Sequence, residues 1–244
     1  MLETSPTTAR PITFTREEFL TERWNYEAGE HVTFIGPTGS GKTFLAYQLL
    51  GVTTTKELPG VVLVIKPKDD TVEKWTKLLD YKIIHTWPPP PRLPYTDPPR
   101  GWVVWPRHTF DPNVDDPAHY VVFRRAILDN YRRGNRVIFA DELYGLVQEL
   151  RLERELVTVW SRGRSMGAGL WGATQKPSHV PLWAYNQADH LFLWNEPDKR
   201  GRDRFREIGG FDSRIVSDTV LTLTEFQCLY INRTHRAMCI IEPE

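Results

Sequence analysis

The feature that most constrains this chain is a glycine-rich octapeptide, which directly follows the apolar and β-branched run at residues 31–35. It consists of Gly36, Pro37, Thr38, Gly39, Ser40, Gly41, Lys42 and Thr43. The order predicts a buried strand that runs into a loop and then into a helix. Glycines let successive backbone N–H groups converge on phosphate oxygens, where any Cβ would obstruct the approach. The pattern indicates a nucleoside triphosphate site rather than a chance turn.

Two side chains at the end of this loop have the chemistry that a triphosphate needs. Lys42 can reach the β- and γ-phosphates as a mobile point charge, and the Thr43 hydroxyl can ligate Mg²⁺. The helix expected over residues 42–50 would also point its positive N-terminus at the same anion. ATP and Mg²⁺ are therefore the expected cofactors.

Composition limits the number of domains and the cellular location that this chain can be expected to have. The chain has 244 residues with 40% hydrophobic content, which favours a single domain over residues 1–244. It contains no apolar run near eighteen residues, and its first residues lack the basic start and apolar stretch of a signal peptide. We expect a cytoplasmic protein with no membrane partner.

The distribution of apolar runs predicts an α/β fold. Most of these runs are continuous, as in strands that are buried on both faces of a parallel sheet. We expect strands at 32–35, 61–65, 102–105, 137–140, 170–173 and 190–194, and helices at 43–50, 71–79, 118–133 and 143–161. The alternation predicts a mostly parallel central sheet flanked by helices. A C-terminal antiparallel β-hairpin is expected within residues 216–242, with its turn near residues 233 and 234.

The segment 86–100 interrupts this pattern, because seven of its fifteen residues are proline. It is expected to form a polyproline-like loop that serves as a rigid spacer or as a recognition loop.

Adjacent carboxylates end the predicted strand at residues 137–140. Asp141 would hold Mg²⁺, and Glu142 would polarise the attacking water as a general base. Acidic residues also favour the first turn of a helix, which is the structural alternative. With the phosphate loop upstream, the acidic pair favours a hydrolase over a kinase or a GTPase.

Three more polar residues are candidates for catalysis. Gln175 ends the predicted strand at 170–173 and could hydrogen-bond the γ-phosphate or the water. Upstream of that strand, Arg162 and Arg164 end a charged helix. In ring-forming motors, an arginine in such a place reaches into the neighbour's site and stabilises the charge of the transition state.

Taken together, the loop at 36–43, the strand end at 139–142 and the segment from Arg164 through Ala173-Thr174-Gln175-Lys176-Pro177 resemble the FtsK/HerA superfamily of DNA-pumping ATPases. The resemblance covers roughly residues 30–215, and Lys176 replaces the commoner arginine. It implies a RecA-like P-loop fold of the ASCE class and a homo-oligomeric ring of five or six subunits. It also implies Arg164 as the arginine finger acting on a neighbouring subunit, with Arg162 as the alternative.

The functional expectation follows from the modules that the chain lacks. It has no winged-helix module, N-terminal barrel or nuclease domain, so it resembles the genome-packaging ATPases of phages and other viruses. The partners implied are double-stranded DNA and a portal or capsid protein. A conjugative-transfer or virion-assembly ATPase and a non-translocating ATP-dependent scaffold are the alternatives.

Several smaller features leave alternatives open. Lys+Arg and Asp+Glu balance at 31 each, but arginines cluster at 124–136 and 198–206, where they could track phosphates or form solvated helix faces. Trp24 and Tyr26 could stack on adenine or belong to the core. Cys228 and Cys239 would lie roughly opposite each other in the hairpin, and as cytoplasmic residues they are expected to be reduced thiols.

Overall fold

The computed structural model describes residues 11–91, 97–175, 177 and 181–243. The chain divides into two compact units, which are described separately below. Unit 1 comprises the described residues of Met1–Tyr26, His31–Lys42 and Ala173–Glu244, and unit 2 comprises those of Glu27–Glu30 and Thr43–Gly172. The single domain over residues 1–244 stays a prediction.

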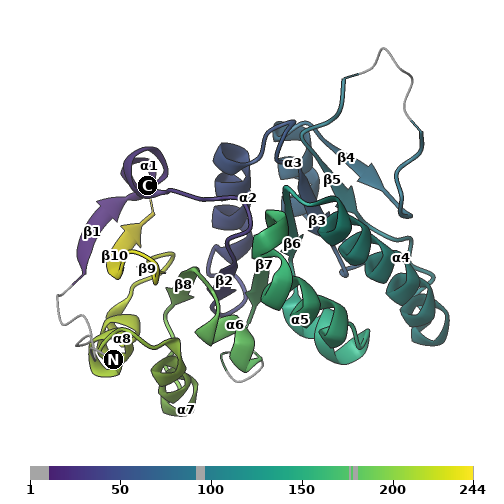
Figure 1. The fold of residues 1–244 in the computed structure, drawn as a ribbon. Helices are drawn as coiled ribbons and strands as arrows, with labels where there is room; N and C mark the ends of the chain where they lie inside the picture. Colours follow the sequence, from purple (N-terminus) through teal and green to yellow (C-terminus); the bar gives the residue numbers. More distant parts are fainter. Residues whose placement is uncertain (1–10, 92–96, 176, 178–180, 244) are drawn as a thin grey trace. The chain divides into compact units, whose positions relative to one another are not determined.

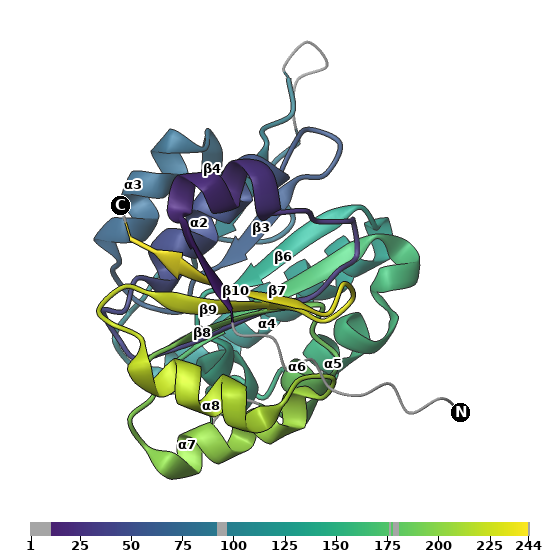
Figure 2. The ribbon, with the colours of Figure 1, turned by 90° about the vertical axis from the view of Figure 1, so that its left-hand side faces the viewer.

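Unit 2 is a parallel sheet covered by helices on both faces. Its strands follow the order β7-β6-β3-β5-β4, and all of their pairings are parallel. Helices α2 and α3 cover one face, and α4 and α5 cover the other (Figures 1 and 2). The elements are α2 (Lys42–Thr53), β3 (Gly60–Leu63), α3 (Asp70–Leu78), β4 (Tyr81–Ile84), β5 (Gly101–Val104), α4 (Pro112–Arg133), β6 (Arg136–Ala140), η2 (Gly145–Glu149), α5 (Glu153–Arg162), η3 (Arg164–Met166) and β7 (Ala168–Thr174).

Local chemistry explains where the helices of unit 2 begin and how they pack. The Asp111 carboxylate accepts from the Asn113 backbone N–H at 3.0 Å and caps α4 just before a proline at its first position. On the opposite face of the sheet, the ring of Tyr47 stacks on Trp75 with centroids 6.2 Å apart and meets Phe139 edge-on at 6.1 Å. These aromatic contacts join α2 to α3 and to β6.

Unit 1 is built on a mixed sheet with the order β1-β10-β9-β8-β2. The β2–β8 and β1–β10 pairs are parallel, whereas β8–β9 and β9–β10 are antiparallel. The short helices α1 and η1 lie on one face, and α6, α7 and α8 lie on the other (Figure 2). The elements are β1 (Ile12–Thr15), α1 (Arg16–Glu18), η1 (Phe19–Arg23), β2 (Val32–Ile35), α6 (Leu182–Asn186), β8 (His190–Trp194), α7 (Lys199–Asp203), η5 (Arg204–Ile208), α8 (Ser213–Thr222), β9 (Cys228–Asn232) and β10 (Ala237–Glu242).

The α/β architecture with parallel strands, flanking helices and a C-terminal hairpin is as the sequence predicts. All six predicted strands are present, and β1 and β4 are additional strands. The hairpin is shorter than predicted, since residues 213–222 form a helix instead. Asp212 caps that helix by accepting from the Arg214 N–H at 2.8 Å, and Val216 and Val220 bury one side of it.

Two further predictions need correction. The helix expected over residues 143–161 is interrupted, because Arg151 has a φ of 55° between η2 and α5. The two cysteines are free and buried, but they are offset along the hairpin. Cys228 pairs with Ile241, and Cys239 pairs with Tyr230.

Parts of some predicted features lie outside the described residues. These are residues 1–10, the stretch 92–96 of the proline-rich segment, and Lys176. Within the described part of the chain, no helix has the length and apolarity that a membrane crossing requires.

Candidate nucleotide-binding site

The glycine-rich loop leaves the carboxyl end of β2 in unit 1. Gly39 and Gly41 have φ angles of 80° and 92°, which an L-residue with a side chain rarely adopts. The buried Lys42 ammonium folds back over the loop and donates to the carbonyl of Pro37 at 2.8 Å. The N–H of Gly36 donates to the carbonyl of Thr174 at 3.2 Å, which ties the start of the loop to the end of β7. The loop has the conformation that its sequence predicts for an anion cradle.

Gln175 lies beside this loop. It is exposed, and together with Pro37 and Thr38 of the loop it lines a cavity of about 550 Å³. Pro177 lines it too, and the remaining lining residues follow β8 and include Asn195 and Glu196. A side chain in this place can meet a group held by the loop, while its role as a γ-phosphate sensor stays a prediction.

In unit 2, the first turn of α2 meets the end of β6. The Thr43 hydroxyl donates to the Asp141 carboxylate at 3.2 Å. The other carboxylate oxygen of Asp141 lies 3.4 Å from the Lys66 ammonium, which also contacts Asp69 at 3.1 Å. Asp141 is buried, with its side chain 1% exposed. Hydroxyl and carboxylate oxygens are therefore adjacent at the place where the sequence predicts the Mg²⁺ ligands.

The charges of this cluster depend on one another. Burial raises the pKa of Asp141 above its ordinary value, and the neighbouring Lys66 opposes that effect only in part. Burial also acts to lower the pKa of Lys66, but the carboxylates of Asp141 and Asp69 outweigh it and raise that pKa. The buried Asp141 carboxylate thus relies on a nearby cation.

Lys66, which follows β3 by three residues, is not among the residues predicted from the sequence. A lone lysine beyond a strand end carries no recognisable pattern, and only the pairing of β3 with β6 brings it to Asp141. Glu142, which the sequence analysis singled out, is half-buried and directly follows Asp141 at the carboxyl end of β6.

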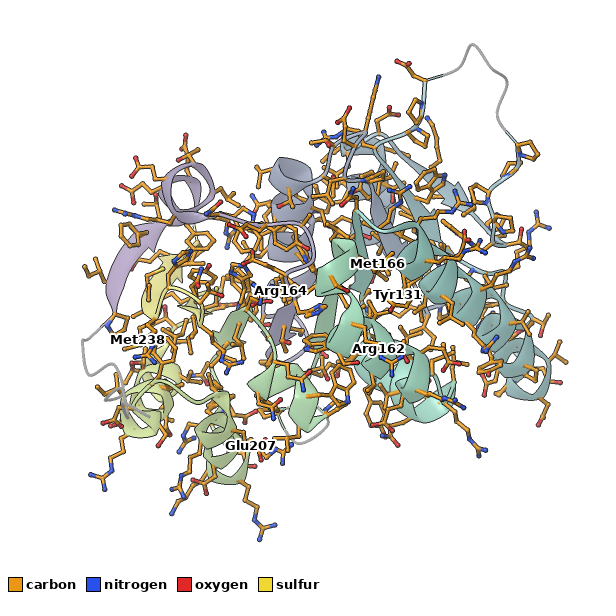
Figure 3. All side chains as sticks on the ribbon, viewed as in Figure 1. Tyr131, Arg162, Arg164, Met166, Glu207 and Met238 are labelled. Carbon is orange, nitrogen blue, oxygen red and sulfur yellow. The ribbon has the colours of Figure 1, made fainter. Side chains whose placement is uncertain are left out.

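The two candidate finger arginines lie at the opposite end of the same strands. Arg162 ends α5 and Arg164 opens η3, both before the first residue of β7 (Figure 3). Strand β7 pairs in parallel with β6, so the end of β6 that carries Asp141 lies about 15–20 Å from the turn at Arg164. Arg164 is 59% exposed, and its guanidinium lies 3.7 Å from the buried carboxylate of Glu30. Neither arginine can act on the carboxylates of its own chain.

Trp24 and Tyr26 lie at the wrong end of the sheet for stacking on adenine. Both rings pack near His190, with centroids 4.8 and 6.2 Å away, and His190 pairs with Val32 at the amino end of β2. The phosphate loop leaves the carboxyl end of β2. These two residues therefore belong to an aromatic cluster of the core.

The basic cluster at residues 198–206 is largely held by its own unit. Arg202 donates to the carbonyls of Glu196 and Pro197, Arg204 pairs with Glu207 at 2.8 Å, and Arg206 pairs with Asp203 at 3.3 Å. This cluster stabilises the turns around α7.

Comparisons with known proteins agree with this geometry at the level of the fold. No family model matches the chain, and no curated protein matches its sequence. The genome-packaging NTPase B204 of Sulfolobus turreted icosahedral virus 2 is similar in structure, with a TM-score of 0.61 and 16% identity over 88% of this chain and 97% of that one. B204 has also been solved with the nucleotide analogue AMPPCP.

Two further solved structures are similar over most of the chain. VirB4 of Thermoanaerobacter pseudethanolicus has a TM-score of 0.63 and 11% identity over 88% of this chain and 89% of that one. The conjugation coupling protein TcpA of pCW3, solved with ATPγS, has a TM-score of 0.50 and 14% identity over 87% of this chain and 59% of that one. The chain thus has the P-loop ATPase fold of B204 and VirB4.

Proposed function

We propose that this chain hydrolyses ATP and that, as a homo-oligomeric ring, it uses the energy to translocate double-stranded DNA during the packaging of a viral genome. The observation that carries the proposal is the Thr43–Asp141 contact, because it joins the end of the phosphate loop to the acidic strand end. The match to the genome-packaging NTPase B204, over 88% of this chain and 97% of that one, supports a packaging motor.

The donor set fits a magnesium ion. Mg²⁺ prefers oxygen ligands and keeps several waters and phosphate oxygens in its shell, so two protein ligands suffice. Thr43 and Asp141 would hold it, and it would neutralise charge that develops on the phosphates. Lys66 would keep the buried Asp141 ionised for this task, since its ammonium lies 3.4 Å away.

The remaining residues of the site would act on the water and the γ-phosphate. Glu142 would accept the proton of the attacking water, and Gln175 would donate a hydrogen bond to the γ-phosphate. Since Arg164 and Asp141 lie at opposite ends of the β6–β7 pair, the finger would serve a neighbouring subunit. Because these groups lie at opposite ends of each chain, we infer a ring in which the arginine of each subunit completes the site of the next.

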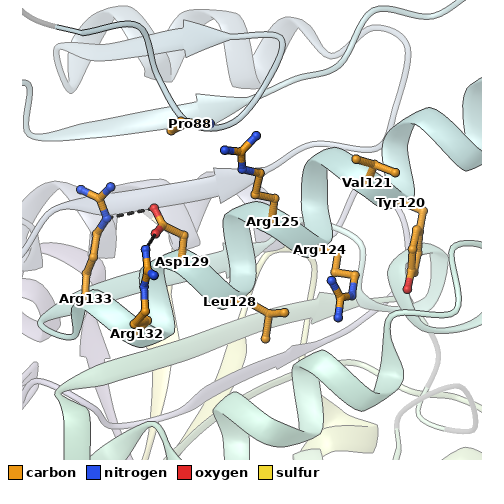
Figure 4. A pocket seen from close by; sticks show the side chains of 9 residues that line it. All are labelled: Pro88, Tyr120, Val121, Arg124, Arg125, Leu128, Asp129, Arg132 and Arg133. Carbon is orange, nitrogen blue, oxygen red and sulfur yellow. Dashed lines mark hydrogen bonds and ion pairs between the residues drawn. The ribbon is translucent and has the colours of Figure 1, made fainter.

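The lining of a groove along α4 supports the proposal that the translocated polymer is a polyanion. It has a volume of about 680 Å³ and is lined by Pro88, Tyr120, Val121, Arg124, Arg125, Leu128, Asp129, Arg132 and Arg133 (Figure 4). Asp129 holds the guanidinium groups of Arg132 and Arg133 at 2.7 and 2.9 Å, and so presents them as a pair. Arg125 makes no ion pair with any described residue. Arg124 is paired with the Glu155 carboxylate at 2.9 Å, so the four arginines of the groove meet two carboxylates. This leaves an excess of positive charge along the groove on a chain with zero net charge.

The ATPase rate with and without duplex DNA tests the proposal. We expect Mg²⁺-dependent hydrolysis that duplex DNA stimulates and that added salt reduces, because phosphate contacts release counterions. Glu142→Gln should abolish turnover. Arg125→Glu should weaken the stimulation, whereas the control Arg154→Glu, on the exposed side of α5, should not.

The alternatives predict other outcomes. A conjugative-transfer or virion-assembly ATPase, which the similarity to TcpA favours, would respond to another polymer more than to duplex DNA. A scaffold that docks partners through its proline-rich loop would hydrolyse ATP at one rate whether or not DNA is present.

A further inference from the structure

A second cavity borders the phosphate loop within unit 1. It has a volume of about 430 Å³ and is lined by Pro37, Thr38, Gly39, Ser40, Trp194, Asn195, Leu223, Thr224, Glu225 and Phe226. The loop forms one wall, the end of β8 forms another, and the turn between α8 and β9 forms the third. Gln175 does not line this cavity, so the two cavities offer different surroundings to a ligand held by the loop.

The turn between α8 and β9 places an aromatic side chain at the loop. Phe226 is 42% exposed, although it is a large hydrophobic residue, and its φ of 63° is unusual for a bulky side chain. A Cβ built on Gly41 would lie 3.5 Å from Cδ1 of this ring. Backbone strain of this kind often occurs at ligand-binding sites.

Hydrogen bonds fix this turn from several sides. The Gln227 N–H donates to the Thr224 carbonyl at 3.2 Å, and the Thr224 N–H donates to the Gln227 side chain at 2.9 Å. The Asn195 amide donates to the carbonyls of Leu221 and Leu223, both at 3.0 Å. The backbone that carries Phe226 is therefore fixed before any ligand arrives, which lowers the entropic cost of stacking.

Trp194 also lines the cavity. Trp194 is 3% exposed, and its Cβ lies so close to Gly36 that a Cβ built there would approach it to 2.6 Å. Its indole N–H is buried and donates to no described residue.

We propose that this cavity is the nucleobase subsite of the chain and that Phe226 is the residue on which the base stacks. The assignment rests on the nucleotide binding proposed above. Stacking on a phenyl ring tolerates every base, because each base has a π-face. The subsite should therefore add affinity for the nucleoside part and discriminate weakly between ATP and GTP.

Calorimetric titration with ADP and with inorganic tripolyphosphate separates the base from the phosphates. Phe226→Ala should raise the Kd for ADP by about 5- to 150-fold, the range that stacking of one base contributes, and leave the Kd for tripolyphosphate unchanged. Phe226→Trp should retain binding of ADP. Phe110→Ala is the matched control, since Phe110 is also exposed and has a φ of 65° in unit 2.

Three other results would overturn the assignment. If Phe226→Ala weakens both ligands equally, then the ring supports the loop and does not bind the base. If it weakens neither, the base lies elsewhere. If the unmodified chain binds neither ADP nor tripolyphosphate, the nucleotide site itself is wrong, and the subsite is wrong with it.

Discussion

At the residue scale, Asp141 shows how a buried charge is maintained beside a phosphate loop. Its carboxylate accepts from Thr43 and faces Lys66, and each of these contacts favours the ionised form that burial opposes. Removing Lys66 would leave the carboxylate buried without its cation. Lys66 thus acts indirectly, by favouring the ionised form of the Asp141 carboxylate.

The two cysteines give a prediction at this scale. Burial raises the pKa of Cys239 to about 12 and raises that of Cys228 further. At pH 8 only about one Cys239 thiol in 10⁴ would be the reactive thiolate. We expect the native protein to resist iodoacetamide and the urea-unfolded protein to take up two labels, as measured by mass spectrometry. Rapid labelling of the native protein would contradict this environment.

At the element scale, sequence patterns located the elements that continuous apolar runs define. β2 and β8 have the predicted bounds, because all of their residues are buried. β4 was missed because only its first residue is buried, which gives a short edge strand no distinctive pattern. Residues 216–222 of α8 fall within the predicted hairpin. They form a helix instead, because capping by Asp212 outweighs the β-branched residues in that segment.

The site shows the same limit. The phosphate loop and the Asp141–Glu142 pair each form a recognisable sequence motif, so both could be identified before the fold was known. Lys66 reaches Asp141, and Phe226 reaches the loop at Gly41, only through tertiary structure. Each comes from a segment with no motif of its own, and the pairing of strands or the geometry of a turn places it.

The segment between β5 and α4 gives a prediction about pH. His108 Nδ1 lies 3.8 Å from the Asp115 carboxylate, and its ring lies 4.6 Å from that of His119. Burial and the neighbouring His119 lower the pKa of His108 below 6.5, while Asp115 opposes them. A histidine whose pKa is lower in the folded protein contributes stability at pH values above its pKa in the unfolded protein. This contribution is lost as the pH falls through its pKa in the folded protein.

The free energy of unfolding should therefore decrease as the pH falls below about 6.5. Urea titrations between pH 5 and pH 8 measure this dependence. His108→Gln should make it shallower, whereas the control His235→Gln, in the exposed turn of the hairpin, should leave it unchanged. Equal slopes for all three proteins would show that His108 does not contribute.

At the scale of the whole molecule, the proposed sharing of sites can be tested by mixing variants. Arg164→Ala should lower turnover by about 10³-fold or more with little effect on ATP binding, because an arginine finger acts on the charge of the transition state. Mixing it with Glu142→Gln should restore part of the activity. In random assembly of an equal mixture, about one interface in four pairs an intact glutamate with an intact arginine.

Two further variants complete this experiment. Arg154→Ala should retain full activity, and Arg162→Ala tests the alternative finger in the same assay. If no ratio of Arg164→Ala and Glu142→Gln subunits exceeds the activity of either one alone, then the sites are not shared through Arg164.

The opposite placement of Arg164 and Asp141 along the parallel β6–β7 pair also dictates the symmetry of any assembly that uses both. Where the face that offers the arginine does not overlap the face that receives it, the contact is heterologous and runs head to tail. Any open row of copies leaves one receiving face empty at one end and one arginine unused at the other. Only a rotation that closes on itself gives every copy a complete set of catalytic groups, and a rotation that fails to close would instead produce a helical filament.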